Sequence, residues 1–236
     1  LNNLLMNNKK KIFIACDTSS TKKINQIIIN SKKENFKFCY KIGLQFFFTK
    51  KGRHFISKLK DEEIFLDIKL NDIPNTCSAA LRSLKDLKRI SYITAHCSGG
   101  LEMLKSIKKT SKKINNKIKI LGVTILTSFS NSSIKEIGHT KSINELVKKQ
   151  ARLAKKARLD GIVCSGKEAK FIKKICKNME IITPGIRLKG DKTGDQKRVV
   201  TPKQAFRNGA TAIVIGRSVT DGNLKKNIKG LIKEIK

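Results

Sequence analysis

Residues 142–165 read SINELVKKQARLAKKARLDGIVCS and contain one unit of the pattern that decides the fold. In Ser142–Arg158, apolar side chains recur every three or four residues with lysines between them, which predicts an amphipathic helix. Ser142 and Glu145 have the spacing of a capping box at its start. Gly161–Ser165 is short and apolar, which predicts a buried strand. A helix that leads into a buried strand is typical of a parallel α/β sheet.

The same alternation continues along the whole chain. Seven further runs are of strand length, rich in β-branched or aromatic residues, and separated by stretches with helical spacing. They are Ile12–Asp17, Phe38–Gly43, Ile64–Lys69, Tyr92–His96, Ile120–Leu126, Ile181–Ile186 and Ala212–Gly216. Eight strands alternating with helices in 236 residues are typical of a (β/α)8 TIM barrel of the α/β class.

The alternative fold is an open, doubly wound sheet, which carries a glycine-rich nucleotide turn after its first strand. Here that turn reads DTSSTKK and contains no glycine. We therefore predict one barrel domain over residues 1–236, without a linker or a second domain. The first ten residues are interpreted as a frayed or miscalled N-terminal extension.

The formal net charge of +34 points at first to nucleic acid or to an anionic membrane. It excludes an acidic tail or a calcium-binding chain. Of the 52 Lys and Arg residues, however, only 9 are Arg, the side chain that reads phosphates and guanines in a bidentate manner. The lysines are spread over the whole chain beside many Asn and Ile residues. We therefore favour a compositional bias over a nucleic-acid surface, and expect no nucleic-acid partner.

The remaining composition predicts a cytoplasmic protein without a membrane segment or a metal site. No apolar run reaches the ~18 residues of a membrane span, and the N-terminus lacks the apolar stretch of a signal peptide. The six cysteines form no CxxC pair and several lie in apolar runs, which indicates reduced thiols. The three histidines have no metal-ligand spacing.

In barrels of this kind the chemistry lies at the C-terminal ends of the strands. Most of the predicted strands end in polar or charged residues, which makes these positions the candidate site. We interpret His96 as a hydrogen-bonded structural residue, and Ser165 has no partners for a nucleophile. The strand-end candidates are Asp17, Lys41, Asp67, Lys69, His96, Thr127, Ser165, Arg187, Gly216 and Arg217.

The most informative segment is LDIKLNDIPNT, residues 66–76. Because side chains alternate along a strand, Asp67 and Lys69 point the same way, and inside a barrel they must pair or meet a ligand. Asp72 follows the strand, and Pro74 prevents the ladder from continuing. Lys41 lies in another apolar strand. The alternative is a solvated ion pair at the surface.

A row of Lys41, Asp67, Lys69 and Asp72 has a clear chemical use. The two ammonium groups keep the carboxylates ionised, and the carboxylates keep Lys69 protonated and oriented. In such a row a carboxylate can repel an anionic group of the substrate, and a lysine can deliver a proton to a carbanion. It needs neither a metal nor a nucleophile.

Two further segments have the composition of a phosphate site. Residues 182–202, ITPGIRLKGDKTGDQKRVVTP, are typical of a mobile lid, in which Arg187 and Gln196 suit phosphate and carbonyl groups. A flexible solvated loop is the alternative. Gly216 and Arg217 end the eighth strand, where barrels commonly bind phosphate. Thr127 and Asp17 are single polar residues that a cap or a turn would also explain.

These segments together resemble the orotidine 5′-phosphate decarboxylase family, most closely its bacterial branch. The stretches IACD, YKIG, FLDIKLNDIPNT, TAHCSGG, VTILTS, VCSG, TPGIRLKGDKTGDQKR and VIGR occur in the family's order between Phe13 and Thr220. The Asp-x-Lys-x-x-Asp-Ile-Pro-Asn-Thr run and the Gly-Asp-Gln-Lys-Arg segment are specific, whereas Gly-Arg is not. Cys16 stands where the family usually has an aliphatic residue. Leu70-Asn71 replaces the commoner Phe-His.

The resemblance implies a role for each charged residue of the row. Lys69 would protonate C6 of the pyrimidine after carbon dioxide leaves, and Asp67 would face the departing carboxylate. Lys41 would hold the ribose hydroxyls and Asp67, and Asp17 would also bind ribose. No cofactor is implied.

The remaining implied roles concern the substrate's two ends and a second subunit. Thr127 would read the pyrimidine edge and Gln196 would bridge base and phosphate. The phosphate would be held by Arg187, Gly216 and Arg217. Asp72, Ile73 and Thr76 resemble residues that this family donates to the neighbouring subunit's site, which implies a homodimer.

The implied activity is cofactor-independent decarboxylation of orotidine 5′-phosphate to uridine 5′-phosphate, the final step of de novo pyrimidine nucleotide synthesis. The nearest alternative is a keto-gulonate phosphate decarboxylase or a hexulose phosphate synthase, which resemble the motif but use magnesium. Leu44 follows Lys-Ile-Gly, where no spare carboxylate is found. Sensitivity to a chelator would separate the two. A nucleic-acid-binding module would instead show steeply salt-dependent binding.

Overall fold

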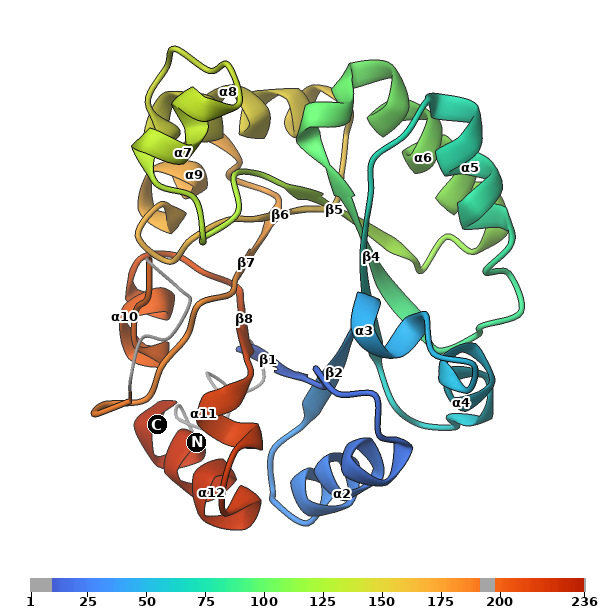
Figure 1. The fold of residues 1–236 in the computed structure, drawn as a ribbon, viewed down its shortest axis with the longest axis vertical. Coiled ribbons are helices and arrows are strands. Elements are labelled where there is room, and N and C mark those ends of the chain that lie inside the picture. The colour runs from blue at the N-terminus through green and yellow to red at the C-terminus, as the bar shows by residue number, and fades with distance from the viewer. Residues whose placement is uncertain (1–9, 192–197, 236) are drawn as a thin grey trace.

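The computed structural model describes residues 10–191 and 198–235. Eight parallel strands close into a barrel in the order β1 to β8, which confirms the predicted TIM barrel (Figure 1). The strands are β1 (Lys11–Ala15), β2 (Phe38–Gly43), β3 (Ile64–Leu70), β4 (Ile90–His96), β5 (Lys119–Val123), β6 (Gly161–Val163), β7 (Glu180–Thr183) and β8 (Ala212–Ile215).

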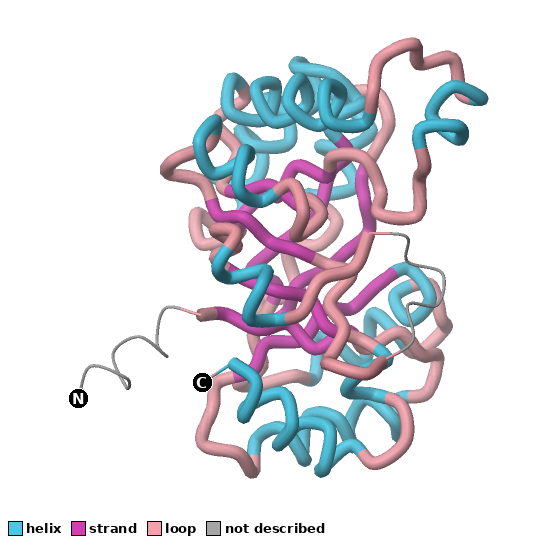
Figure 2. Tube along the Cα trace, turned by 90° about the vertical axis from the view of Figure 1, so that its left-hand side faces the viewer, coloured by secondary structure: helices cyan, strands magenta, loops and turns pink. Residues whose placement is uncertain are grey.

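Helices surround the strands, and Figure 2 shows the strands in the middle of the molecule with the helices outside them. They are α2 (Thr21–Lys32), α3 (Leu44–Phe47), α4 (Gly52–Lys58), α5 (Pro74–Arg82), the short 3-10 helix η1 (Cys97–Gly99), α6 (Gly100–Ile114), α7 (Asn131–Glu136), α8 (Ile143–Lys156), α9 (Ala169–Ile175), α10 (Pro202–Arg207), α11 (Arg217–Thr220) and α12 (Leu224–Ile235). Within the described ranges, no helix is long and apolar enough to cross a membrane.

Helix α8 begins where its sequence predicts. The Ser142 hydroxyl accepts a hydrogen bond from the backbone N–H of Glu145, and the Glu145 carboxylate accepts one from the backbone N–H of Ser142. Both bonds of the capping box are therefore present, and they satisfy backbone donors that a helix start leaves without partners.

Several strands are shorter than the apolar runs that predict them. β1 ends at Ala15 rather than Asp17, β5 at Val123 rather than Leu126, and β7 at Thr183 rather than Ile186. The last residues of these runs leave the ladder and form the loops at the C-terminal mouth of the barrel. The apolar pattern continues there because the apolar residues of these loops, such as Ile125 and Ile186, are also buried or half-buried.

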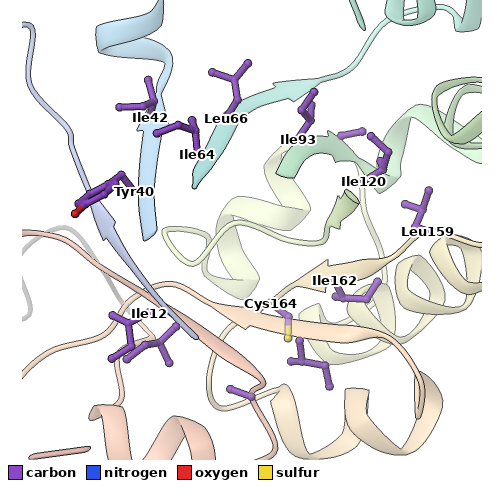
Figure 3. Close-up of a cluster of buried hydrophobic side chains, with 14 of the residues drawn as sticks. Ile12, Tyr40, Ile42, Ile64, Leu66, Ile93, Ile120, Leu159, Ile162 and Cys164 are labelled. Atoms are coloured by element: carbon purple, nitrogen blue, oxygen red, sulfur yellow. The ribbon is translucent and has the colours of Figure 1, made fainter. Parts of the chain in front are cut away.

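The core has two layers, because side chains alternate along each strand. Facing the barrel interior, the rings of Phe13, Phe65 and Tyr92 meet edge to face or tilted, with Phe13 5.1 Å from Phe65 and 5.2 Å from Tyr92 between centroids. The other face of each strand packs against the helices. Figure 3 shows part of this outer layer, in which Ile42 and Leu66 lie on neighbouring strands.

A ring of ion pairs lies at the N-terminal end of the barrel. Lys11 Nζ lies 2.6 Å from Glu63 Oε1 and 3.0 Å from the hydroxyl of Tyr92. The Tyr92 hydroxyl in turn lies 3.1 Å from Glu180 Oε2, and Glu180 pairs with Lys119. Each carboxylate thus has a cation, so the charges at this end stabilise the fold without being left for a ligand.

The pair between Lys11 and Glu63 predicts a pH-dependent stability. Burial alone raises the pKa of Glu63, but the hydrogen bonds from Lys11 and Cys39 outweigh it, so the net pKa lies below its ordinary value of 4.5. A lowered carboxyl pKa contributes stability that is complete above the ordinary value and is lost as the pH falls through the folded value. We expect Glu63→Gln to lower the unfolding free energy by about 1 kcal/mol at pH 7.

This difference should narrow as the pH falls below 4.5, because Glu63 of the parent chain then becomes protonated. Urea unfolding followed by circular dichroism between pH 7 and pH 3 measures it. The exposed Glu136, changed to Gln, is the control and should show no such trend. A gap between parent and Glu63→Gln that stays constant over this range would contradict the prediction.

Candidate active site

A cavity of about 510 Å³ opens at the C-terminal end of the barrel. Its walls come from residues near or just beyond the ends of β1, β2, β3, β5, β6, β7 and β8. Eight of the residues that the sequence pattern singles out lie in these walls: Asp17, Lys41, Asp67, Lys69, Thr127, Arg187, Gly216 and Arg217.

Four of these residues form a row of alternating charge. Lys41 Nζ lies 2.8 Å from Asp17 Oδ1 and 3.6 Å from Asp67 Oδ2. Lys69 Nζ lies 2.8 Å from the same Asp67 Oδ2. One carboxylate is thus shared by two ammonium groups. The Asp67 side chain is 13% exposed and that of Lys69 is 29% exposed, so their pair is only partly solvated.

The neighbouring charges keep Lys41 and Asp67 ionised. Burial alone raises the pKa of Asp67, but Lys41 and Lys69 together with hydrogen bonds from Lys69 and Thr94 bring it below its ordinary value. Burial likewise lowers the pKa of Lys41, and Asp67 and Asp17 more than reverse this, so the net pKa is raised. At neutral pH Lys41 and Asp67 therefore stay charged, although both side chains are largely desolvated.

A bulge in β3 brings Asp67 and Lys69 together. Leu66 pairs with Ile93 of β4 and Leu70 with Ala95, so Asp67, Ile68 and Lys69 lie opposite Thr94 alone. Lys69 has a φ of 49°, in the left-handed region that a lysine rarely adopts. The two side chains meet as the sequence pattern predicts, but a break in the regular alternation produces the contact.

The sequence pattern did not single out two residues that support the row. Thr94 is completely buried, and its hydroxyl contacts both Asp67 and the backbone of Lys69. Counting in steps of two from the inward-facing Tyr92 places Thr94 inward, so this parity is the signal that could have found it. Gly43 is the second: a Cβ there would lie 3.1 Å from Asp17 Oδ1 and 3.2 Å from Lys41 Nζ.

Two arginines converge at another part of the cavity wall. Burial and the positive charge of Arg217 lower the pKa of Arg187. Both side chains line the cavity, together with Gly216. Guanidinium groups bind phosphate well through charge-assisted hydrogen bonds. This part of the site is therefore electrostatically suited to an anion.

Other predicted residues lie elsewhere. Thr127 is buried in the cavity wall, whereas Gln196 and the central part of the predicted lid lie outside the described residues. Asp72, Ile73 and Thr76 are exposed and do not line the cavity of their own chain. The Asp72 carboxylate accepts a hydrogen bond from the backbone N–H of Ile73, at 2.7 Å. Within one chain, Asp17 and not Asp72 completes the alternation of charge.

Two other candidates have structural surroundings. The Ser165 backbone N–H donates to Glu168 Oε2 at 2.9 Å, so Ser165 forms part of a loop network, as expected for a residue that is no nucleophile. His96 is half-buried at the end of β4, and burial and Lys69 lower its pKa. In the part of the chain that the structure describes, its ring makes no hydrogen bond. The expectation of a hydrogen-bonded His96 therefore stays a prediction.

A buried ion pair joins three loops of the cavity mouth. Arg198 pairs with Glu168, which is 3% exposed, and donates to the carbonyl oxygens of Ile125 at 3.0 Å and Leu126 at 2.7 Å. Because Thr127 follows Leu126 directly, this guanidinium helps to hold the loop that carries Thr127. The same segment pairs back on the cavity wall through hydrogen bonds between Val200 and residues 185–187.

The residues present contain no evident metal centre. Among residues 10–191 and 198–235, no three His, Cys, Asp or Glu side chains come together in a way that could hold a metal ion. The carboxylates of Asp17 and Asp67 are both occupied by Lys41.

A closed (β/α)8 barrel with charged residues and converging arginines at the C-terminal mouth defines a TIM-barrel enzyme that takes an anionic substrate. A family model places it further: the chain belongs to the orotidine 5′-phosphate decarboxylase / HUMPS family, whose model matches residues 10–228. This confirms the resemblance seen in the sequence motifs.

Individual relatives agree with this assignment. The chain is 42% identical over 211 residues to the orotidine 5′-phosphate decarboxylase of Staphylococcus epidermidis, covering 88% of this chain and 90% of that protein. It is 37% identical over 233 residues to the enzyme of the same name from Coxiella burnetii, with 96% and 97% covered. The crystal structure of orotidine 5′-phosphate decarboxylase from Lactobacillus acidophilus superposes with a TM-score of 0.81 at 31% identity, over 95% of this chain and 98% of that one.

The Arg198–Glu168 pair predicts a non-additive loss of stability. Removing one partner of a buried pair leaves the other charge without compensation, so Arg198→Met and Glu168→Gln should each lower the unfolding free energy by about 3 kcal/mol. The double variant should lose much less than the sum of the two, because no isolated charge remains. Urea unfolding of all four chains measures the coupling.

The exposed pair of Arg53 and Asp86 is the matched control. Arg53→Met should change stability by less than ~1 kcal/mol, because surface pairs contribute little. Additive losses for Arg198→Met and Glu168→Gln would contradict a coupled buried pair.

Proposed function

We propose that this chain decarboxylates orotidine 5′-phosphate to uridine 5′-phosphate and carbon dioxide without a cofactor, with Lys69 as the proton donor. The reaction is the final step of de novo pyrimidine nucleotide synthesis. The observation that carries the proposal is the carboxylate of Asp67 held between Lys41 and Lys69 on the cavity wall, in a chain of this family.

The proposed reaction has two steps, loss of carbon dioxide and then protonation of the pyrimidine carbon. The bond between C6 of the pyrimidine and its carboxylate breaks, carbon dioxide leaves, and the electron pair remains on C6. The ammonium of Lys69 lies beside this carbon and delivers a proton to it, and water later returns a proton to the amine. Asp67 orients the Lys69 ammonium through their ion pair and places negative charge near the departing carboxylate.

The substrate's remaining groups are assigned to the residues that the family resemblance implies. Arg187, Gly216 and Arg217 bind the phosphate, and Asp17 and Lys41 bind the ribose hydroxyls. Thr127 reads the pyrimidine edge, and Gln196 bridges base and phosphate. The phosphate lies far from the reacting carbon, so its binding energy can hold the base in the reactive position and thereby appear in the rate.

The active form is proposed to be a homodimer in which Asp72, Ile73 and Thr76 of one protomer complete the site of its partner. All three are exposed in the single chain, and Ile73, an apolar residue, is 66% exposed. A partner that covers Ile73 removes apolar surface from water. Asp72 would then add a second carboxylate beside Lys69 and extend the charge row.

We propose the cytoplasm as the place of action. All six cysteines are free and buried, and burial raises the pKa of Cys16 and Cys164 to about 12, so these thiols are unreactive. The excess of lysine is proposed to attract an anionic nucleotide toward the site rather than to bind nucleic acid or a membrane.

Lys69→Ala tests the proton donor. The parent chain should consume orotidine 5′-phosphate, followed by loss of the orotidylate absorbance, and the variant should lose about 10²–10⁴-fold or more in kcat. Lys22→Ala, on the exposed face of α2, is the control and should turn over normally. Uridine 5′-phosphate should raise the melting temperature of all three chains, because a bound nucleotide stabilises the fold.

A parent chain that neither consumes the substrate nor responds to millimolar uridine 5′-phosphate would overturn the proposed function. Normal turnover by Lys69→Ala would overturn only the role of Lys69.

Subunit mixing tests the shared site. Lys69→Ala and Asp72→Asn should each be nearly inactive as pure proteins. Co-expressed with two different tags, they should form mixed dimers in which one site carries both changes and the other carries neither. A random mixture should therefore recover about a quarter of parent activity, since half of the dimers have one intact site. No recovery in purified mixed dimers would contradict the exchange of Asp72 between protomers.

A further inference from the structure

The β3 bulge leaves backbone groups that the regular ladder cannot satisfy. Between the pairs Leu66–Ile93 and Leu70–Ala95, three residues of β3 lie opposite one residue of β4. The backbone N–H of Lys69 lies in this gap, and Lys69 has the strained φ of 49°. Such a conformation persists only when its surroundings hold it in place.

Thr94 is the single residue of β4 that faces the gap. Its hydroxyl oxygen accepts a hydrogen bond from the backbone N–H of Lys69, at 2.9 Å. The same hydroxyl donates its proton to Asp67 Oδ1, also at 2.9 Å. A hydroxyl has one proton to donate and lone pairs that accept. The Thr94 hydroxyl uses its proton for Asp67 and a lone pair for the Lys69 N–H.

We propose that Thr94 is a positioning residue for the decarboxylation, which fixes the ionised Asp67 carboxylate and the strained backbone of Lys69 in the arrangement that aims the ammonium at the substrate. This inference rests on the proposed function. Thr94 does not line the cavity and has no exposed surface, so it acts through Asp67 and Lys69 and not by contact with the substrate.

The hydrogen bond from Thr94 fixes the orientation of the Asp67 carboxylate toward the two lysines. Thr94 holds Oδ1, and this leaves Oδ2 for Lys69 at 2.8 Å and Lys41 at 3.6 Å. A carboxylate free to rotate could exchange its two oxygens or turn away from the lysines. One neutral donor therefore fixes the orientation of the charge shared by the two cations.

The hydroxyl also affects the ionisation of Asp67. The groups that face Asp67 are Lys41 from β2, Lys69 and Thr94; Asp17 reaches it through Lys41, and His96 lies near it at the end of β4. Both lysines and the Thr94 hydrogen bond favour the charged carboxylate and lower its pKa. Removal of the Thr94 hydroxyl should therefore raise the pKa of Asp67.

Three variants separate positioning from packing. Thr94→Val keeps the volume and removes the hydroxyl, whereas Thr94→Ser keeps the hydroxyl and removes a methyl group. We expect Thr94→Val to lower kcat about 10²-fold, with the KM and the affinity for uridine 5′-phosphate nearly unchanged. Thr94→Ser should stay within about fivefold of the parent. Thr94→Ala should resemble Thr94→Val and serves if that variant does not fold.

The dependence of kcat on pH separates the two roles further, because a residue that only supports the fold would not shift this dependence. As the pH falls, activity is lost when Asp67 becomes protonated, so the acid limb of kcat in Thr94→Val should lie at higher pH than in the parent or in Thr94→Ser. Aspartate-selective ¹³C NMR gives the same comparison without any turnover. The signal that is missing in Asp67→Asn identifies Asp67, and its titration should move upward in Thr94→Val.

The outcomes distinguish the inference from the proposed function. A parent chain that does not decarboxylate the substrate contradicts the function, while the NMR titration still tests the link between Thr94 and Asp67. An unchanged kcat in Thr94→Val, an unchanged Asp67 titration, or a Thr94→Ser variant as defective as Thr94→Val would each overturn the positioning role. A variant that only melts at lower temperature would do so as well.

Discussion

The carboxylate of Asp67, shared between the ammonium groups of Lys41 and Lys69, is the interaction on which the site depends. These charges lie on the wall of a barrel whose interior is otherwise filled by aromatic and aliphatic side chains. A buried charge is stable only when it is paired and hydrogen-bonded. Gly43 gives Asp17 and Lys41 room to meet, and Thr94 completes the bonds of Asp67. The surrounding strands thus hold the Asp67 carboxylate between the ammonium groups of Lys41 and Lys69.

Both ends of the barrel carry buried or half-buried ion pairs, but their other cations are placed differently. At the N-terminal end, Lys11 and Lys119 each have a carboxylate partner, and Tyr92 links the two pairs. At the C-terminal end, Arg187 lies close enough to Arg217 for its pKa to be lowered. The N-terminal end therefore contributes to the fold, whereas the C-terminal end also presents two neighbouring guanidinium groups to the cavity.

Most of the barrel and the residues around its mouth could be predicted from sequence, because strands of a TIM barrel place their last residues on one face. The charges that interrupt apolar runs, such as Lys41 and Asp67, were visible for this reason. The bulge could not be predicted, because it depends on how β3 pairs with a strand about 25 residues further along the chain. Thr94 and the Arg198–Glu168 pair were missed for the same reason. Whether a polar side chain supports the site depends on which residues distant in the sequence it contacts in the fold.

The bulge in β3 explains how the ammonium of Lys69 comes into direct contact with the carboxylate of Asp67, two residues earlier. In a regular strand, side chains at positions i and i+2 stand side by side about 6–7 Å apart and reach the same space in parallel. The left-handed turn of the backbone at Lys69 instead directs its ammonium to within 2.8 Å of Asp67 Oδ2. A strained residue of this kind costs roughly 1–3 kcal/mol. The barrel can tolerate that cost because the ion pair of Asp67 with Lys69 and the two hydrogen bonds of Thr94 offset it in this conformation.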